Sequence, residues 1–316
     1  MNNNQNLSSI RQAFGDTLHH LATLNPKIFV VDADLKSSLF LDKFATDFPD
    51  RFIECGVAEA NAAGIAAGLA KTDKTVFLTS FACFSPAINW NTIKQSICYN
   101  NANVKIIGSH SGLMSTDLGA THQMLEDVGL MRSLPNMEVF APLDAIETEK
   151  IIKTAAHSPH PAYIRLVRPP TEIMFDKKSS FTIGKSHVLK KGKDLTIIGY
   201  GPILNLAFQS QKLLKEKGKN ISIEIINCSS IKPLDTITIL KSVKKTKRLI
   251  VLEDHQKQGG LGEAVASLVL SNNLNCHFAH LAVDNKFGQS SKDVDELYNH
   301  FGISLNHLME TIKKIL

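Results

Sequence analysis

FIECGVAEANAAGIAAGLA, residues 52–70, carries almost no side-chain bulk after Glu59. Gly64 and Gly68 lie one helical turn apart, and residues at that spacing share one face of a helix. We therefore expect a helix over residues 61–71 that another helix or backbone can approach closely, including one from a second subunit. Glu59 opens this run among apolar neighbours. It either serves the helix dipole from the first turn or is an isolated carboxyl group that can donate a hydrogen bond.

On both sides of this stretch, short apolar runs rich in β-formers alternate with helical patterns. We expect strands over residues 28–31, 75–78, 104–107, 137–141, 162–167, 195–200, 222–226, 248–252 and 275–281. Further helices are expected over residues 10–24, 86–99, 144–157, 203–217 and 261–272. Such alternation predicts an α/β fold in which mainly parallel sheets are covered by helices on both faces.

The alternation pauses once, which marks a domain boundary. Residues 168–184 contain Pro169-Pro170 and the polar run KKSS, and strand–helix alternation resumes after them. Boundaries between domains fall in polar, proline-marked segments of this kind. We predict two consecutive domains, residues 1–170 and 187–316, joined by a linker over residues 171–186.

Composition excludes several classes of protein. With 43% hydrophobic and 21% charged residues among 316, the chain can bury a core and is not expected to be disordered. No apolar run approaches the ~18 residues of a membrane helix, and the polar, uncharged start does not resemble a signal peptide, so we expect a cytoplasmic protein. The five cysteines show no CxxC spacing, which argues against a disulfide framework and a zinc site.

The net charge of +5 comes from lysines concentrated in the second half of the chain. No aromatic residues are interleaved among these lysines, and no nucleic-acid-binding motif is present. We therefore expect a solvated lysine-rich surface and no nucleic-acid partner.

Two phenylalanines follow the predicted strand over residues 75–78. Phe81 and Phe84 lie in the sequence TSFACFSP. Aromatic residues at this position are usually part of the core. They can also form a stacking platform for a planar heterocycle, because ligands of such sheets bind at the carboxyl ends of the strands.

A long polar loop is expected at residues 109–123, after the next strand. It contains glycines and two histidines, a composition typical of functional loops. Arg165 and Arg168 flank the end of another predicted strand. Each can form a surface ion pair or bind a phosphate, which the planar guanidinium suits.

Several segments occur in the order found in transketolase-type thiamine diphosphate enzymes. They are GVAEAN and GIAAGLA (56–70), TSFACF (79–84), GATHQMLEDVGLMRSLPNMEVFAPLDAIET (119–148) and PAYIRLVRP (161–169). The chain resembles the second half of such an enzyme, a pyrimidine-binding domain followed by a C-terminal domain. The β subunits of 2-oxo-acid dehydrogenases and deoxyxylulose-phosphate synthase share this arrangement, and the segment around GATHQ is most similar to transketolase.

The resemblance implies roles in cofactor binding. Glu59 matches the catalytic glutamate that hydrogen-bonds a ring nitrogen of the aminopyrimidine. Phe81 and Phe84 match the aromatic pair against that ring, with Phe84 as the stacking residue. Asp34 resembles the aspartate that lines the cofactor pocket.

The resemblance also implies roles in substrate binding. His122 matches the histidine near the reacting hydroxyls, which serves in catalysis and binding. Arg11, Ser38 and Arg168 fall where transketolases hold the sugar phosphate.

One position departs from the family pattern. The aspartate that usually precedes Gly-Pro-Thr-His is Leu118 here, and Asp117, a further substrate-binding candidate, lies one place earlier. Leucine cannot hydrogen-bond a sugar hydroxyl, so the usual substrate preference is not assured.

The family's Gly-Asp-Gly motif, which holds the diphosphate through Mg²⁺ on a separate domain, does not occur in the 316 residues. We therefore expect no metal site on this chain. The resemblance implies thiamine diphosphate and Mg²⁺ as cofactors, with the metal and the diphosphate held by a partner, an N-terminal transketolase subunit. It also suggests homodimerisation within an α₂β₂ heterotetramer.

The resemblance implies a split transketolase that transfers a two-carbon ketol unit between phosphorylated sugars, as in pentose phosphate metabolism. Two alternatives remain open at this point. The chain can be the β subunit of a 2-oxo-acid dehydrogenase decarboxylase component, or a non-catalytic scaffold subunit that keeps the fold. The histidine in Gly-Ala-Thr-His favours sugar chemistry, and the presence of Glu59, His122 and Arg168 argues against a scaffold.

Overall fold

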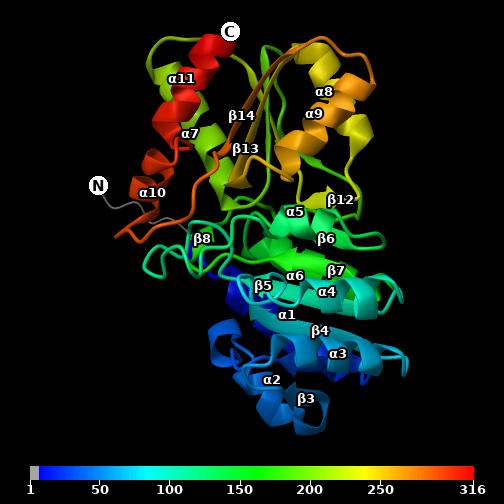
Figure 1. Cartoon of the computed structure of the whole chain (residues 1–316). Helices are drawn as coiled ribbons and strands as arrows, with labels where there is room; N and C mark the ends of the chain where they lie inside the picture. The colour runs from blue at the N-terminus through cyan, green and yellow to red at the C-terminus, as the bar shows by residue number, and fades with distance from the viewer. Residues whose placement is uncertain (1–6) are drawn as a thin grey trace.

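Two mainly parallel sheets lie one above the other in the computed structural model, with helices on both faces of each (Figure 1). The structure describes residues 7–316. The first six residues of the predicted first domain, with the polar start, lie outside the described residues. The α/β class predicted from the alternating pattern is confirmed.

The first sheet has seven strands, and all neighbours are parallel except the last pair. Its order is β3 (Phe52–Glu54), β2 (Ile28–Asp32), β4 (Thr75–Phe81), β5 (Val104–Ser109), β7 (Ala162–Arg165), β6 (Glu138–Phe140) and β12 (Ser230–Lys232). Strand β12 comes from the second half of the chain and runs antiparallel to β6. It covers an edge that would otherwise expose unpaired backbone groups, so the two halves share this sheet.

Alternate side chains of each strand face opposite layers of helices. In β4, Val76 and Leu78 join the cluster that contains α3, whereas Phe77 joins the cluster that contains α1. This is the two-residue period of a strand buried on both faces. One layer comprises α1 (Ile10–Leu24), α2 (Asp42–Asp47) and α6 (Ala145–His157), and the other α3 (Glu59–Ala70), α4 (Trp90–Thr92), the π-helical turn Ile93–Cys98 and α5 (Asp127–Arg132).

The second sheet has five strands in the order β14 (His277–Val283), β13 (Arg248–Gln256), β10 (Leu195–Gly199), β11 (Ile223–Asn227) and β9 (His187–Lys190). Only β9 is antiparallel to its neighbour. Helices α8 (Thr236–Thr246) and α9 (Leu261–Ser271) cover one face, and α7 (Asn205–Glu216), α10 (Val294–His300) and α11 (Leu305–Ile315) the other.

Short elements complete the chain. The pair β1 (Leu7–Ser8) and β8 (Thr171–Glu172) joins the start of the described chain to the start of the predicted linker. Three 3₁₀ turns lie at Ser37–Leu39, Pro49–Arg51 and Pro202–Leu204.

The helix predicted over residues 86–99 forms only from Trp90 to Cys98. The side chain of Asn89 donates to the main-chain oxygen of Glu59 at 2.9 Å and to Ser85 Oγ at 3.2 Å. These bonds stabilise a turn before the helix, as amide side chains commonly do. The turn therefore brings the segment that contains Phe84 against the start of α3.

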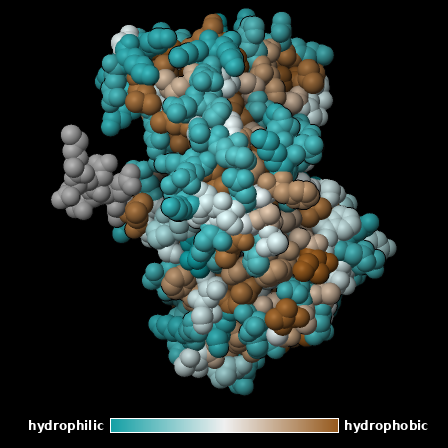
Figure 2. All heavy atoms as spheres, turned by 60° about the vertical axis from the view of Figure 1, so that its left-hand side comes forward, coloured by the Kyte–Doolittle hydropathy of each residue, from teal (hydrophilic) through white to brown (hydrophobic). Residues whose placement is uncertain are grey.

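Helix α3 presents its two glycines to solvent. Four of its alanines, at positions 62, 63, 66 and 67, are buried against the first sheet, whereas nothing lies within 4 Å of a Cβ placed on Gly64 or Gly68. This face therefore has room for the close approach predicted from the sequence. On the side of the molecule in Figure 2, hydrophobic residues gather over the N-terminal domain, while the C-terminal domain is mostly hydrophilic. Within residues 7–316, no helix combines the length and the apolar character needed to cross a membrane.

Candidate functional site

The carboxyl ends of parallel strands bring the candidate residues to one edge of the first sheet. In register, Asp32 at the end of β2 pairs with Glu54 of β3 and Thr79 of β4. Phe81 at the end of β4 pairs with Ser109 of β5. Residues that follow these strands therefore meet at the same edge, where α/β sheets bind ligands.

Glu59 lies at this edge as the first residue of α3, and the residue is 8% exposed. Within residues 7–316 its carboxylate has no hydrogen-bond partner in the protein. Burial, with the nearby Glu59 carboxylate adding to it, raises the pKa of the Cys83 thiol to about 11. Glu59 is therefore next to the segment that carries Phe81 and Phe84, and its carboxyl group is free to bind a ligand.

Phe81 and Phe84 are stacked, with ring centroids 6.0 Å apart and an interplanar angle of 12°. Both side chains are only partly buried. His110 lies against Phe81, with centroids 3.8 Å apart, and His122 contacts Phe84 edge-on at 5.4 Å. The two histidines therefore border the phenylalanine pair. Both phenylalanines remain partly exposed, as a stacking platform requires.

His110 is a site residue that was not among the candidates predicted from the sequence. It is 4% exposed and has a left-handed backbone, with φ 57°. Burial, followed by the positive charges of Arg11 and Arg168, lowers its pKa to about 3. The imidazole is therefore neutral at physiological pH, with one donor and one acceptor nitrogen. Its Nδ1 is hydrogen-bonded to Ser109 Oγ at 2.8 Å, which leaves Nε2 for a ligand. The signal available in the sequence was its place directly after strand β5.

Two arginines border the histidines. Arg11 Nε donates to the main-chain oxygen of Arg168 at 3.0 Å, and Arg11 Nη1 donates to that of Ser38 at 2.5 Å. Arg168 forms an ion pair with Asp117, and the arginine side chain is 37% exposed. Ser38 contributes its main-chain oxygen to this arrangement. The structure thus brings together four predicted substrate-binding residues: Arg11, Ser38 and Arg168, predicted at the sugar phosphate, and Asp117.

Asp34 lies nearby but outside this cluster. Its side chain is exposed, and its main-chain N–H donates to Glu54 Oε1 at 2.9 Å. Asp32, two residues earlier, is buried and accepts hydrogen bonds from Thr79 Oγ1 and, at 2.7 Å, from Leu35 N. Burial raises the pKa of Asp32 to about 6. Asp32 was not predicted as a site residue, although its position at the end of a strand was a usable signal.

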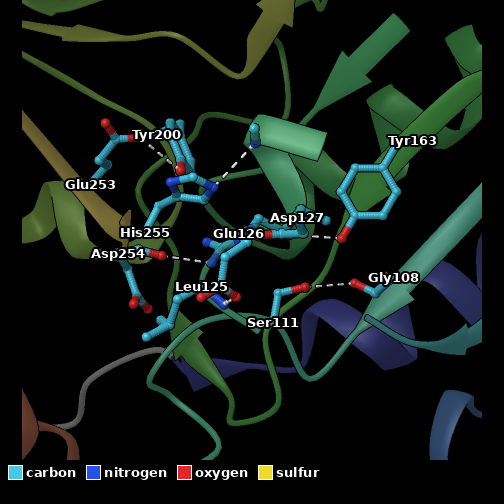
Figure 3. Close-up of polar contacts among 12 residues, drawn as sticks. Gly108, Ser111, Leu125, Glu126, Asp127, Tyr163, Tyr200, Glu253, Asp254 and His255 are labelled. Atoms are coloured by element: carbon cyan, nitrogen blue, oxygen red, sulfur yellow. Dashed lines mark hydrogen bonds and ion pairs between the residues drawn. The ribbon is translucent and has the colours of Figure 1, made fainter. Parts of the chain in front are cut away.

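Arg165 neither lies on the surface nor binds a phosphate, the two roles considered from the sequence. Its Nε donates to Asp127 Oδ2 at 2.9 Å, and its Nη2 donates to the main-chain oxygen of Asp254 at 2.6 Å. Tyr163 Oη donates to the same Asp127 oxygen at 2.7 Å. Figure 3 shows Asp127 between Tyr163 and the β13 residues 253–255. This buried cluster joins the two domains.

The glycine-rich turn of the second domain packs against the first. His255 Nε2 accepts from Gly129 N at 3.2 Å (Figure 3). A Cβ on Gly259 would lie 2.9 Å from the Cα of Gly129, and Gly259 has a positive φ of 75°. His255 and these glycines therefore serve the contact between domains.

The described residues suit the ring part of thiamine diphosphate. The unpartnered carboxyl of Glu59 and the stacked pair Phe81 and Phe84 suit a planar, nitrogen-containing ring. Within residues 7–316, no group of three or more His, Cys, Asp or Glu side chains could hold a metal ion.

Two family models together match most of the chain. The family model for the transketolase pyrimidine-binding domain matches residues 8–172, and that for the transketolase C-terminal domain matches residues 184–308. The chain is 40% identical to a transketolase C-terminal section of Methanocaldococcus jannaschii over 312 residues, which cover 96% of each protein. It is 35% identical to a subunit of the apulose-4-phosphate transketolase of Phocaeicola vulgatus over 307 residues, or 97% of each.

A solved structure agrees with these matches. The chain superposes on a split-gene transketolase, described as an inactive β₄ tetramer, with a TM-score of 0.88 and 37% identity over 98% of both chains. The chain therefore belongs to the transketolase family, whose members are thiamine diphosphate-dependent transferases. Within that family it corresponds to the C-terminal part, which comprises the pyrimidine-binding and C-terminal domains.

Proposed function

We propose that this chain is the C-terminal subunit of a split transketolase and transfers a two-carbon ketol unit between phosphorylated sugars. One observation carries the proposal. A carboxyl group (Glu59), a stacked aromatic pair, two histidines and two arginines lie together at one edge of the first sheet. When bound, thiamine diphosphate supplies the nucleophilic carbon that this chemistry requires.

In this proposal the residues of the chain bind, orient and hold protons. Glu59 hydrogen-bonds the pyrimidine, and Phe84, supported by Phe81, stacks against it. His122 and the neutral His110 hydrogen-bond the hydroxyls of the sugar near its reacting carbonyl. The exposed carboxylate of Asp34, outside this cluster, is available to contact the outer part of the bound cofactor.

The phosphate end of the substrate is held by Arg168 and Arg11. A phosphate can replace the Asp117 carboxylate on the Arg168 guanidinium, because both groups can accept two parallel hydrogen bonds from arginine. Ser38 fixes the orientation of Arg11 through its main-chain oxygen. The name of one relative, an apulose-4-phosphate transketolase subunit, supports a phosphorylated sugar. Leu118 stands where the family has aspartate and cannot hydrogen-bond a sugar hydroxyl. The preferred sugar can therefore differ in stereochemistry from the usual transketolase substrates.

The proposal includes an N-terminal partner subunit that holds the diphosphate and Mg²⁺. Three relatives support such a division, since one is named as a C-terminal section, one as a subunit of a transketolase and one as a split-gene transketolase. The exposed glycine face of α3 supplies a surface on which a second copy or the partner can pack, which would give an α₂β₂ assembly.

Mixing the subunits tests the proposal. We expect no ketol transfer from xylulose 5-phosphate to ribose 5-phosphate by this chain alone, and turnover when the N-terminal partner, thiamine diphosphate and Mg²⁺ are added. A mixture that binds the cofactor but uses 2-oxo acids would favour the decarboxylase alternative. Turnover by the isolated chain would contradict the need for a partner.

Replacing Arg168 with Gln should raise KM for phosphorylated sugars by about 10- to 100-fold. Hydrogen bonds to charged groups contribute about 1.5–3 kcal/mol, and about 1.4 kcal/mol corresponds to a factor of ten. The control is the same variant assayed with the unphosphorylated sugar, where KM should not change. Equal losses on both sugars would mean that Arg168 does not bind the phosphate.

A further inference from the structure

The loop that carries the proposed substrate-binding residues is held at its start by the first domain. Residues 110–123 contain His110, Asp117 and His122. Ser111 N donates to Leu166 O at 3.1 Å, and Ser111 Oγ donates to Gly108 O at 2.9 Å (Figure 3). These bonds fix only the first turn of the loop, so its remaining polar backbone groups need other partners.

The C-terminal domain supplies the next contact through a buried carboxylate. Leu113 N donates to both carboxylate oxygens of Asp254, at 3.0 and 3.1 Å. A Cβ on Gly112 would overlap Asp254 Oδ2, and Gly112 has a positive φ of 72°. The loop backbone thus passes directly against Asp254, in a conformation that glycine adopts without strain.

A second contact comes from the segment after β14, residues 286–291. Gln123 Nε2 donates to Gln289 O at 3.0 Å, and Ser291 N donates to Thr116 O at 2.9 Å. A Cβ on Gly288 would overlap Gln123 Oε1. The segment therefore touches the loop near its middle and at its end, on both sides of Asp117.

We propose that the C-terminal domain positions the substrate-binding loop, with Asp254 and Gly288 as positioning residues; this rests on the proposed function. Asp254 fixes the backbone at Leu113, and Gly288 leaves the space in which Gln123 can bond to the segment 286–291. Together they set where His122 stands against Phe84. This gives the second domain a role in substrate binding although it contributes no side chain to the site.

Gly288→Ala tests the second contact in the reconstituted enzyme. The added methyl must displace Gln123, so we expect KM for the sugar phosphate to rise by about tenfold, since small misplacements of binding groups have large effects. A loss of folded protein alone would lower the maximal rate and leave KM unchanged. Unchanged KM in Gly288→Ala would overturn the proposal for this contact.

Asp254→Asn and Asp254→Leu test the first contact as a pair. Asparagine keeps an oxygen that accepts from Leu113 N, so its KM should stay within about twofold of the wild type, whereas leucine should raise KM by about tenfold. The matched control is Asp284→Asn, which removes an exposed ion pair with Lys257 that does not reach the loop. It should leave KM unchanged.

Hydrogen exchange of the chain itself separates this inference from the proposed function. The amide of Leu113 should be protected in the wild type and in Asp254→Asn, and should exchange at least about tenfold faster in Asp254→Leu. If the wild-type mixture shows no ketol transfer, the proposed function fails while this measurement still tests the contact. Equal exchange in all three proteins would overturn the positioning role.

Discussion

Glu59→Gln should lower ketol transfer by the reconstituted enzyme by about 10³-fold, within the range of about 10²–10⁴ expected for proton-transfer groups. Glutamine has nearly the same shape, so the first turn of α3 should form normally. It lacks the carboxyl group that can share a proton with a ring nitrogen. Steady-state turnover of the mixed subunits measures the effect.

The control for this variant is Glu149→Gln on α6. Glu149 is exposed and forms a surface ion pair with Lys153, so its replacement should leave turnover unchanged. Binding of the partner subunit, followed by gel filtration, shows that both variants still assemble. If Glu59→Gln keeps full turnover, Glu59 has no catalytic role. If the wild-type mixture assembles and has no turnover, the scaffold alternative gains support.

The strands of both sheets were predictable because most are buried on both faces. Continuous apolar runs such as those of β2 and β13 give a strong signal, and each of the nine predicted strands has a counterpart in the structure. Strands β3, β9 and β12 were not predicted, and they are short strands at or near sheet edges. Strands β3 and β12 have only three residues each, and β9 alternates between partly buried and exposed positions, so no apolar run marks them.

Three helices of the second domain were not predicted either. Helix α8 has the sequence TITILKSVKKT, and its β-branched start is more typical of a strand. The structure shows that Asp235 is its N-cap, because the Asp235 carboxylate accepts from Thr238 N at 3.1 Å. Helices α10 and α11 begin after Asp293 and Ser304, residues that favour N-caps, but no apolar run between β14 and the C-terminus is long enough to mark either helix by itself.

The site was predictable in part, because motif residues follow adjacent parallel strands and so meet at one edge. The contacts that support it were not predictable. Leu113 and Asp254 are 141 positions apart, and nothing in either segment indicates the other. The burial of Arg165 was not predictable for the same reason. Arg165 ends strand β7, its partner Asp127 begins helix α5, and only packing removes both from water.

Asp127→Leu should lower the free energy of unfolding by about 3–5 kcal/mol, because it leaves Arg165 buried without its carboxylate. The Arg165 side chain is 3% exposed and the Asp127 side chain is 0% exposed. Burial alone would lower the pKa of the Arg165 guanidinium, but Asp127, Tyr200, Asp254 and Tyr163 together outweigh burial and raise it, so the arginine is charged when the domain is folded. The variant would also leave Tyr163 Oη without its acceptor. Denaturant unfolding followed by circular dichroism measures the loss.

The double variant Asp127→Leu/Arg165→Met separates charge burial from lost packing. Removing both charges also removes the cost of dehydrating the guanidinium, so the double variant should be more stable than Asp127→Leu alone by about 1–4 kcal/mol. The two single variants and the double variant form a cycle whose non-additivity reports the coupling of the pair. Glu149→Gln again serves as the control, since an exposed pair contributes about 1 kcal/mol at most. A double variant less stable than Asp127→Leu would show that Arg165 stabilises the domain contact mainly through its bond to the main chain of Asp254.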